Sequence, residues 1–127
     1  MDFKNKYLVI VLRSLLGLAF VAVGIMGLFI GLPKDGVSQA GLASFQGMDA
    51  LGITKLIAVV ELVAGLLIVT NYRPALGAVL VAPIIVSMLA YHVMHEPATI
   101  APSFILGLLD AYLGYAYWDK YKALFAP

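Results

Sequence analysis

Hydrophobic residues gather along this chain into four long runs, which short polar turns and one longer polar segment separate. The pattern predicts four helices, which we expect at about residues 7–32, 54–70, 75–95 and 99–118. A helix rises ~1.5 Å per residue, so ~20 apolar residues cross the ~30 Å hydrocarbon core of a bilayer. We therefore expect an all-α fold, a membrane four-helix bundle, that forms a single transmembrane domain over residues 1–127.

The first run is expected to be a retained helix and not a cleaved signal peptide, because its apolar part is long and no small-residue cleavage site follows it. One stripe of this helix, with steps of three and four residues, carries Arg13, Gly17, Phe20, Gly24, Gly27 and Gly31. Glycines on one stripe let a second helix approach closely. The glycine face is therefore the one expected to be buried, together with the charge of Arg13.

Residues 33–53 are too polar and too rich in glycine to form a span. Their apolar side chains recur with nearly helical spacing, at Val37, Leu42, Phe45, Met48 and Leu51. This pattern is typical of an amphipathic helix that lies in the membrane interface. Long connections of this kind serve as lids or binding segments, or simply as connectors, and the sequence leaves both roles open.

The second and third predicted helices form a hairpin around the polar turn at residues 71–74. Pro74 suits the first position of a helix, where its missing N–H costs nothing. Pro83 lies inside the third helix and is expected to kink it. Glu61 lies within the second helix and His92 near the end of the third, so the hairpin would carry ionisable groups at two depths.

Composition supports the membrane interpretation. Hydrophobic residues make up 63% of the 127 residues and charged residues 12%, whereas a soluble domain is about half apolar and about a quarter charged. The net charge of +1 argues against binding to a nucleic acid, which requires a clustered basic face. The absence of cysteine excludes disulfides, thiolate metal ligands and thiol chemistry. No haem, flavin or metal signature is present, so a redox function would need a bound organic cofactor, such as a quinone, or a partner subunit.

Four crossings would place both termini on the same side of the membrane. The basic residues on that side would be Lys4, Lys6, Arg73, Lys120 and Lys122, against Lys34 and Lys55 on the other. Because basic residues concentrate on the cytoplasmic side, we expect cytoplasmic termini in a bacterial inner membrane.

Helical rise places Arg13, Glu61 and Asp110 roughly 9–15 Å in from the cytoplasmic side, so the three can meet in one inner layer. A charge in hydrocarbon is costly and persists by facing inward and pairing. One arginine cannot fully neutralise two carboxylates, so contact among the three predicts a proton shared by Glu61 and Asp110. A purely structural network that fixes helix register is the alternative.

An outer layer is expected near the opposite face, with His92 as its ligand candidate and His95 and Glu96 at the rim. His92 could donate a hydrogen bond to a quinone carbonyl or transfer a proton. Two histidines without a third ligand do not make a metal site, so no bound metal is expected.

Short motifs along the chain combine a charged residue with glycine or proline at fixed spacing. They are Arg13-x-x-x-Gly17, Glu61-x-x-x-Gly65, Arg73-Pro74, and His92 followed by Glu96-Pro97. Together with residues 40–53, these motifs resemble the DoxX family of small four-helix membrane proteins over nearly the whole chain. Ile25-Met26 stand where many members have a polar pair, so the resemblance carries no ligand role to the end of the first helix.

The resemblance implies two kinds of function. Some DoxX members are linked to quinone-coupled oxidation of sulfur compounds or to complexes that handle oxidative stress. A redox-associated subunit of this kind would bind a quinone and use the inner-layer groups and His92 for protons, with electrons supplied by a partner. Other relatives resemble assembly chaperones, which predicts a non-catalytic subunit of a larger complex. The expected partners are membrane lipid, a quinone, and other membrane subunits or a second copy; whether the chain is an enzyme stays open.

Overall fold

The computed structural model describes residues 5–31 and 36–127. Its α-helices are α1 (Lys6–Ile25), α2 (Gln39–Ala50), α3 (Ile53–Val69), α4 (Pro74–His95), α5 (Ala101–Ala116) and α6 (Trp118–Tyr121). A π-helical segment, η1 (Met26–Ile30), continues α1, and two 3-10 turns are η2 (Pro97–Thr99) and η3 (Lys122–Phe125). The described residues contain no strand, which confirms the all-α prediction. Leu32 of the first predicted helix, and Lys4 and Lys34 of the charge comparison, lie outside the described residues.

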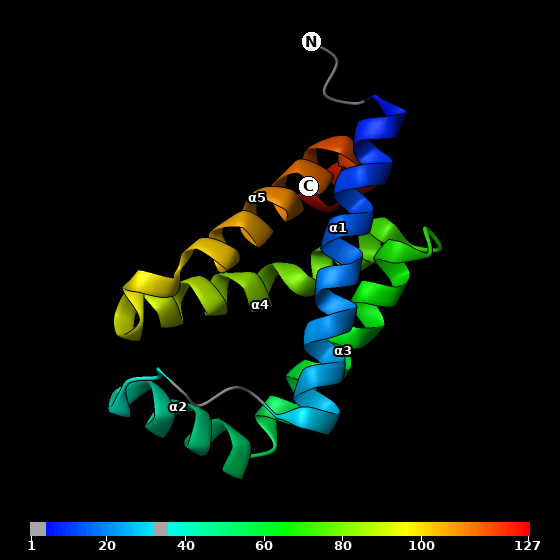
Figure 1. The fold of residues 1–127 in the computed structure, drawn as a ribbon. Helices are drawn as coiled ribbons and strands as arrows, with labels where there is room; N and C mark the ends of the chain where they lie inside the picture. Colours follow the sequence, from blue (N-terminus) through cyan, green and yellow to red (C-terminus); the bar gives the residue numbers. More distant parts are fainter. Residues whose placement is uncertain (1–4, 32–35) are drawn as a thin grey trace.

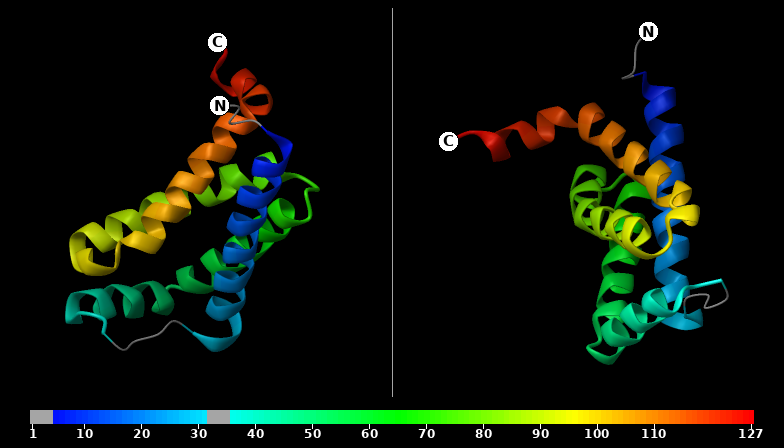
Figure 2. Two further views of the ribbon diagram at one scale, coloured as in Figure 1. Left: turned by 45° about the horizontal axis from the view of Figure 1, so that its top comes forward. Right: turned by 90° about the vertical axis from the view of Figure 1, so that its left-hand side faces the viewer.

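The helices form two pairs and one separate arm. In Figure 1, α1 and α3 run side by side, while α4 and α5 form a hairpin that extends away from this pair. The separate arm is α2, which leaves the far end of α3 at an angle of 84° and returns toward the α4–α5 connection, as both views in Figure 2 show.

Among the described residues, two helices are long and apolar enough to cross a membrane, namely α1 with η1, and α4. A third crossing results if the bent pair α2 and α3 is counted as one span. The four-helix membrane bundle is therefore supported only in part. With 17 and 16 residues, α3 and α5 are shorter than the other two. Each measures roughly 25 Å, somewhat less than the ~30 Å hydrocarbon core.

The backbones of α1 and α3 approach each other where glycines remove the side chains between them. A Cβ atom added at Gly24 would lie 2.7 Å from the backbone nitrogen of Leu62, and one added at Gly65 would lie 2.6 Å from that of Val21. These distances confirm that the glycine stripe of α1 is a helix-packing face. Gly31, with φ of 86° and open space around it, does not take part.

The core lies where α1, α3, α4 and α5 meet. Its buried members are Leu16, Phe20, Ala64, Ile68, Ala78, Val81, Ile85 and Leu113. Many large apolar side chains are exposed on the outer faces of the same helices, among them Leu18, Val63, Val86, Phe104 and Leu108. Such faces need an apolar environment, either lipid or another protein.

A clasp, which we define as Ser38, Phe45, Tyr91 and Glu96, holds α2 against the end of α4. The Ser38 hydroxyl caps α2 by accepting a hydrogen bond of 3.0 Å from Gly41 N–H, and the Ser38 N–H donates to the Glu96 carboxylate. The rings of Phe45 and Tyr91 lie 4.9 Å apart. The hydrogen bonds from Ser38 hold the pKa of Glu96 below its ordinary value of 4.5, and the nearby imidazoles of His92 and His95 act in the same direction.

Substituting Gly65 by alanine should push α1 and α3 apart. The added Cβ would meet backbone atoms, which cannot rotate away, so we expect a loss of roughly 1–3 kcal/mol in the free energy of unfolding. Thermal unfolding of the purified protein in detergent measures the effect. Gly114→Ala is the matched control, because nothing lies within 4 Å of the added atom, and alanine there should be neutral or stabilising by up to about 1 kcal/mol. Equal transition temperatures for the two variants would contradict the packing argument.

The clasp should open in acid. A depressed pKa in the folded state means that Glu96 stabilises docking above its ordinary pKa of 4.5 and loses this effect as the pH falls through the lower folded-state value. We therefore expect the backbone amides of Gln39–Ala50 to exchange hydrogen faster at acidic pH, after correction for the intrinsic exchange rate. In the Glu96→Gln variant, the same amides should exchange faster already at neutral pH. Asp119→Asn serves as the control, because it removes a carboxylate of α6 that is paired with Lys122 and does not belong to the clasp. Unchanged protection of α2 in Glu96→Gln would refute the clasp.

Candidate functional site

The ionisable residues predicted for the inner layer lie on three different helices, as expected. Arg13 on α1 is 8% exposed and Glu61 on α3 is 5% exposed, while Asp110 on α5 is half-buried. Among the described residues, however, no hydrogen bond or ion pair joins any two of these three. The structure therefore does not contain the direct Arg–Glu–Asp contact on which the prediction of a shared proton was based.

Arg13 points toward the end of the molecule and away from the carboxylates. Its Nη1 atom donates to the Ile68 carbonyl at 3.4 Å, near the carboxyl end of α3. Helical rise gives the height of a Cα atom along its helix but not the direction of a long side chain, and here the Arg13 side chain reaches the carboxyl end of α3. Glu61 lies seven residues before Ile68, roughly 10 Å deeper along α3.

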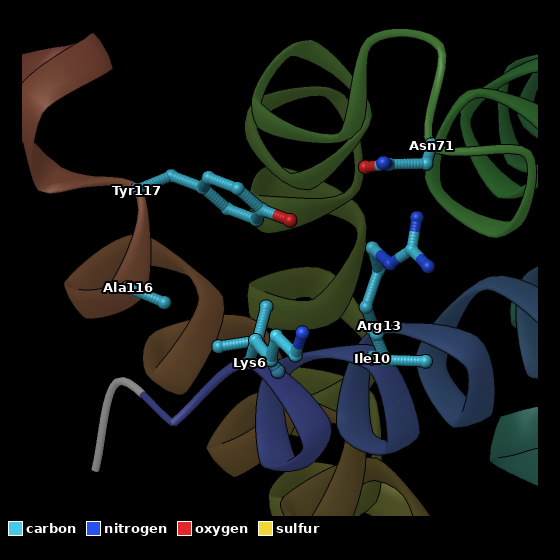
Figure 3. Close-up of a pocket in the computed structure, with 7 residues that line it drawn as sticks. Lys6, Ile10, Arg13, Asn71, Ala116 and Tyr117 are labelled. Atoms are coloured by element: carbon cyan, nitrogen blue, oxygen red, sulfur yellow. The ribbon is translucent and has the colours of Figure 1, made fainter. Parts of the chain in front are cut away.

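The Arg13 guanidinium borders a pocket of about 280 Å³, which we call the cationic pocket. Its lining consists of Lys6, Val9, Ile10, Arg13, Asn71, Ala116 and Tyr117. Figure 3 shows the Tyr117 hydroxyl and the Asn71 side-chain amide directed toward each other across this space, with Lys6 and Arg13 at its border. Every polar side chain of the lining carries a hydrogen-bond donor, and none is acidic.

Sequence reasoning did not find three of the residues that form the cationic pocket. Lys6 counted only toward orientation, Asn71 only as part of a turn, and Tyr117 only as a residue near the end of the fourth predicted helix. One signal was present for Asn71: asparagine is among the few residues that readily adopt positive φ, and its φ is 60°. The convergence of three chain segments at this pocket could not be read from a linear pattern.

Glu61 is enclosed by the α1–α3–α4 interface. Its neighbours on the same side of α3 pack closely: Gly65 meets α1, and the Ala64 carbonyl lies 2.7 Å from the position of a Cβ added at Gly77 of α4. The Glu61 Oε2 atom is buried and has no hydrogen-bond partner. An unpaired buried oxygen is costly, so Glu61 is a group whose protonation or hydration the fold must accommodate.

Asp110 lines a second cavity, the α4–α5 groove, also of about 280 Å³. The other lining residues are Ala82, Ile85, Val86, Leu89, Phe104, Gly107, Leu108 and Ala111, all without polar side chains. The Asp110 Oδ1 atom is buried and finds no hydrogen-bond partner in the part of the chain that the structure describes. The groove thus combines apolar walls with one carboxyl oxygen that is free to bind.

The Asp110 carboxylate also affects the pKa of Tyr121, near the end of the chain. Burial and the Asp110 carboxylate, followed by Tyr117, raise the pKa of Tyr121 to about 12. The Tyr121 hydroxyl donates to the Ala75 carbonyl at 2.7 Å and so ties α6 to the start of α4. Because a tyrosine with this pKa stays protonated at neutral pH, the hydrogen bond persists there.

His92, the ligand candidate of the outer layer, belongs to the connection between α4 and α5. Its Nδ1 atom lies 3.2 Å from the Glu96 carbonyl and 3.2 Å from the Thr99 hydroxyl, and its ring meets Tyr91 edge-on. This ring nitrogen therefore helps to end α4, and no hydrogen bond connects it to Asp110 or Glu61. Lys55 is also engaged, because its ammonium donates to the Gly27 and Leu28 carbonyls, both at 3.0 Å.

Within residues 5–31 and 36–127, no group of three or more His, Asp or Glu side chains is arranged so that it could hold a metal ion. The arrangement instead offers two separate polar sites: a cationic pocket at one end of the molecule, and a single carboxyl group in an apolar groove.

The comparisons with known proteins identify no relative: no protein-family model, no curated protein and no solved structure matches this chain. The resemblance to the DoxX family therefore stays a prediction from the motifs alone.

Proposed function

We propose that this chain is a DoxX-like integral membrane protein that binds a quinone, or a lipid of similar chemistry, in the α4–α5 groove and acts as a subunit associated with redox proteins. The observation that supports it most is the Asp110 Oδ1 atom, which is buried without a hydrogen-bond partner in an otherwise apolar cavity. Buried polar atoms are nearly always paired, so a bound ligand is a natural partner.

A carboxyl group suits both forms of a quinone. When protonated it can donate to a quinone carbonyl, and when ionised it can accept from the hydroxyl of the reduced form. The same side chain can therefore hold the ring in either state and pass one proton to or from it. No second ionisable group lines the groove, which makes Asp110 the residue responsible for the polar contact.

The groove fits a ring with a long apolar tail. Its volume of about 280 Å³ is close to the lower end of ordinary ligand sites, roughly 300 Å³, and suits one head group. Val86, Phe104 and Leu108 at its border are more than half exposed on the outer surface. An isoprenoid-type tail could leave the groove over these side chains and continue into the bilayer.

The proposal includes four membrane crossings, with α3 and α5 as the two short ones. Several features support this arrangement: α1 begins and α5 ends beside the same pocket, and apolar side chains are exposed on all four helices. Helices roughly 25 Å long cross a bilayer that thins locally around them. Because the sequence lacks cysteine and any haem signature, electrons would come from a partner protein.

Substituting Asp110 by leucine should weaken quinone binding by at least about tenfold, because one buried hydrogen bond to a carboxyl group is lost. Gly107→Leu should have a similar effect by filling the groove, since a Cβ there meets its nearest neighbour at an ordinary 3.5 Å. The measurement is equilibrium binding of a short-chain quinone to the purified protein in lipid nanodiscs.

Glu61→Gln is the matched control for this experiment, because it alters a buried carboxyl group that does not line the groove. Binding should be retained in this variant. If the unmodified protein binds no quinone, or if Asp110→Leu and Gly107→Leu bind as well as Glu61→Gln, the quinone proposal fails and the assembly role becomes the better explanation.

A further inference from the structure

We propose that the cationic pocket binds a phosphate-type oxyanion at the membrane boundary. The pocket does not overlap the α4–α5 groove, because the two linings share no residue. It collects two cationic side chains, Lys6 and Arg13, and two neutral groups that can donate, the Asn71 amide and the Tyr117 hydroxyl, around a common space (Figure 3). A cavity with several donors, two positive charges and no carboxylate is complementary to an anion.

Arg13 is the central residue of this proposal. It is more than nine-tenths buried, and within residues 5–31 and 36–127 its guanidinium makes one hydrogen bond, at 3.4 Å, to the Ile68 carbonyl. A guanidinium carries five N–H donors in a planar fork, so most of its hydrogen-bonding capacity is unused. No carboxylate of the described residues forms an ion pair with Arg13. A buried charge without a counter-ion is expensive, and a bound anion would supply both the charge and the missing acceptors.

The turn between α3 and α4 holds Asn71 in place next to Arg13. The Asn71 N–H donates to the Ile68 carbonyl at 3.2 Å, so one carbonyl oxygen accepts from both Asn71 and Arg13. With φ of 60°, Asn71 occupies a backbone conformation that few side chains adopt. The turn therefore fixes the backbone of Asn71 beside Arg13 before any ligand binds.

The place of the pocket in the fold indicates which kind of oxyanion reaches it. Lys6 begins α1, Asn71 follows α3 and Tyr117 follows α5, so three helix ends meet there. Ends of apolar helices lie at the level of lipid head groups. The Val9 and Ile10 side chains add an apolar wall beside the donors. A phospholipid could place its phosphodiester against Arg13 and its glycerol carbons against this wall, and free phosphate presents the same oxygens.

The guanidinium favours phosphate over a simple halide ion. Its parallel N–H groups match two oxygens of one phosphate, whereas the Lys6 ammonium acts as a point charge. Asn71 and Tyr117 can then donate to the remaining oxygens. Four donors from three chain segments would also tie the ends of α1, α3 and α5 together when the anion is bound.

Native mass spectrometry of the detergent-purified protein tests this proposal with phosphatidylglycerol, phosphatidylcholine and inorganic phosphate as probes. Asn71→Gly removes the amide and keeps a residue that accepts positive φ. Tyr117→Phe removes only the hydroxyl, and Lys6→Gln removes only a charge. We expect the Asn71→Gly/Tyr117→Phe double variant to bind phosphatidylglycerol about tenfold more weakly, and addition of Lys6→Gln to weaken it further. Lys120→Gln is the control, because Lys120 is exposed and does not line the pocket.

Arg13→Gln should abolish binding, and circular dichroism must show that this variant keeps its helices, since the Ile68 contact is also lost.

If millimolar inorganic phosphate displaces bound phosphatidylglycerol, the result supports an anion site that serves free phosphate. Binding that inorganic phosphate does not displace, but that exceeds binding of phosphatidylcholine, supports a lipid head-group site. The proposal is overturned if neither phosphatidylglycerol nor inorganic phosphate binds, or if the folded double variant retains the affinity of Lys120→Gln. These outcomes do not depend on quinone binding.

Discussion

The backbones of α1 and α3 touch at Gly17, Gly24 and Gly65, where no side chain separates them. Contact at this distance fixes the register of the two helices, because a shift by one residue would place a Cβ atom against the backbone. The register then decides which groups share a depth. Arg13, one turn before Gly17, comes level with the end of α3, whereas Glu61, one turn before Gly65, stays in the interior.

Much of the fold could be predicted because helix formation and burial follow local patterns. The apolar runs located α1, α3, α4 and α5 to within a few residues, and the glycine spacing identified the face of α1 that packs. The 84° bend before α3 could not be predicted, since Gly52, at φ of 77°, only permits a turn and does not set its direction. The docking of α2 depends on Ser38 and Glu96, which are distant in sequence.

Sequence reasoning singled out Arg13 and Asp110 as candidate site residues, but it predicted neither their arrangement nor the part that Lys6, Asn71 and Tyr117 take in the cationic pocket. Rise per residue gives the depth of a Cα atom, and a long side chain such as Arg13 then covers several Å in a direction that depends on its neighbours. The outcome keeps Arg13 apart from the carboxyl group of Asp110: Arg13 borders the cationic pocket with Lys6, and Asp110 lies in an apolar groove. Each group is thereby left with unused hydrogen-bonding capacity, which an ion pair between them would have consumed.

The hydrogen bond between Ser38 and Glu96 joins residues 58 positions apart, with α3 and α4 between them. A ribosome makes the chain from its amino end, so α2 is complete long before its acceptor exists. The α1–α3 pair can assemble once Val69 has been synthesised, but α2 has to wait until α4 is finished. The α2 arm is therefore the last of these elements to reach its final position during biogenesis, and until then its apolar side chains lack the contact with Tyr91 that α4 provides.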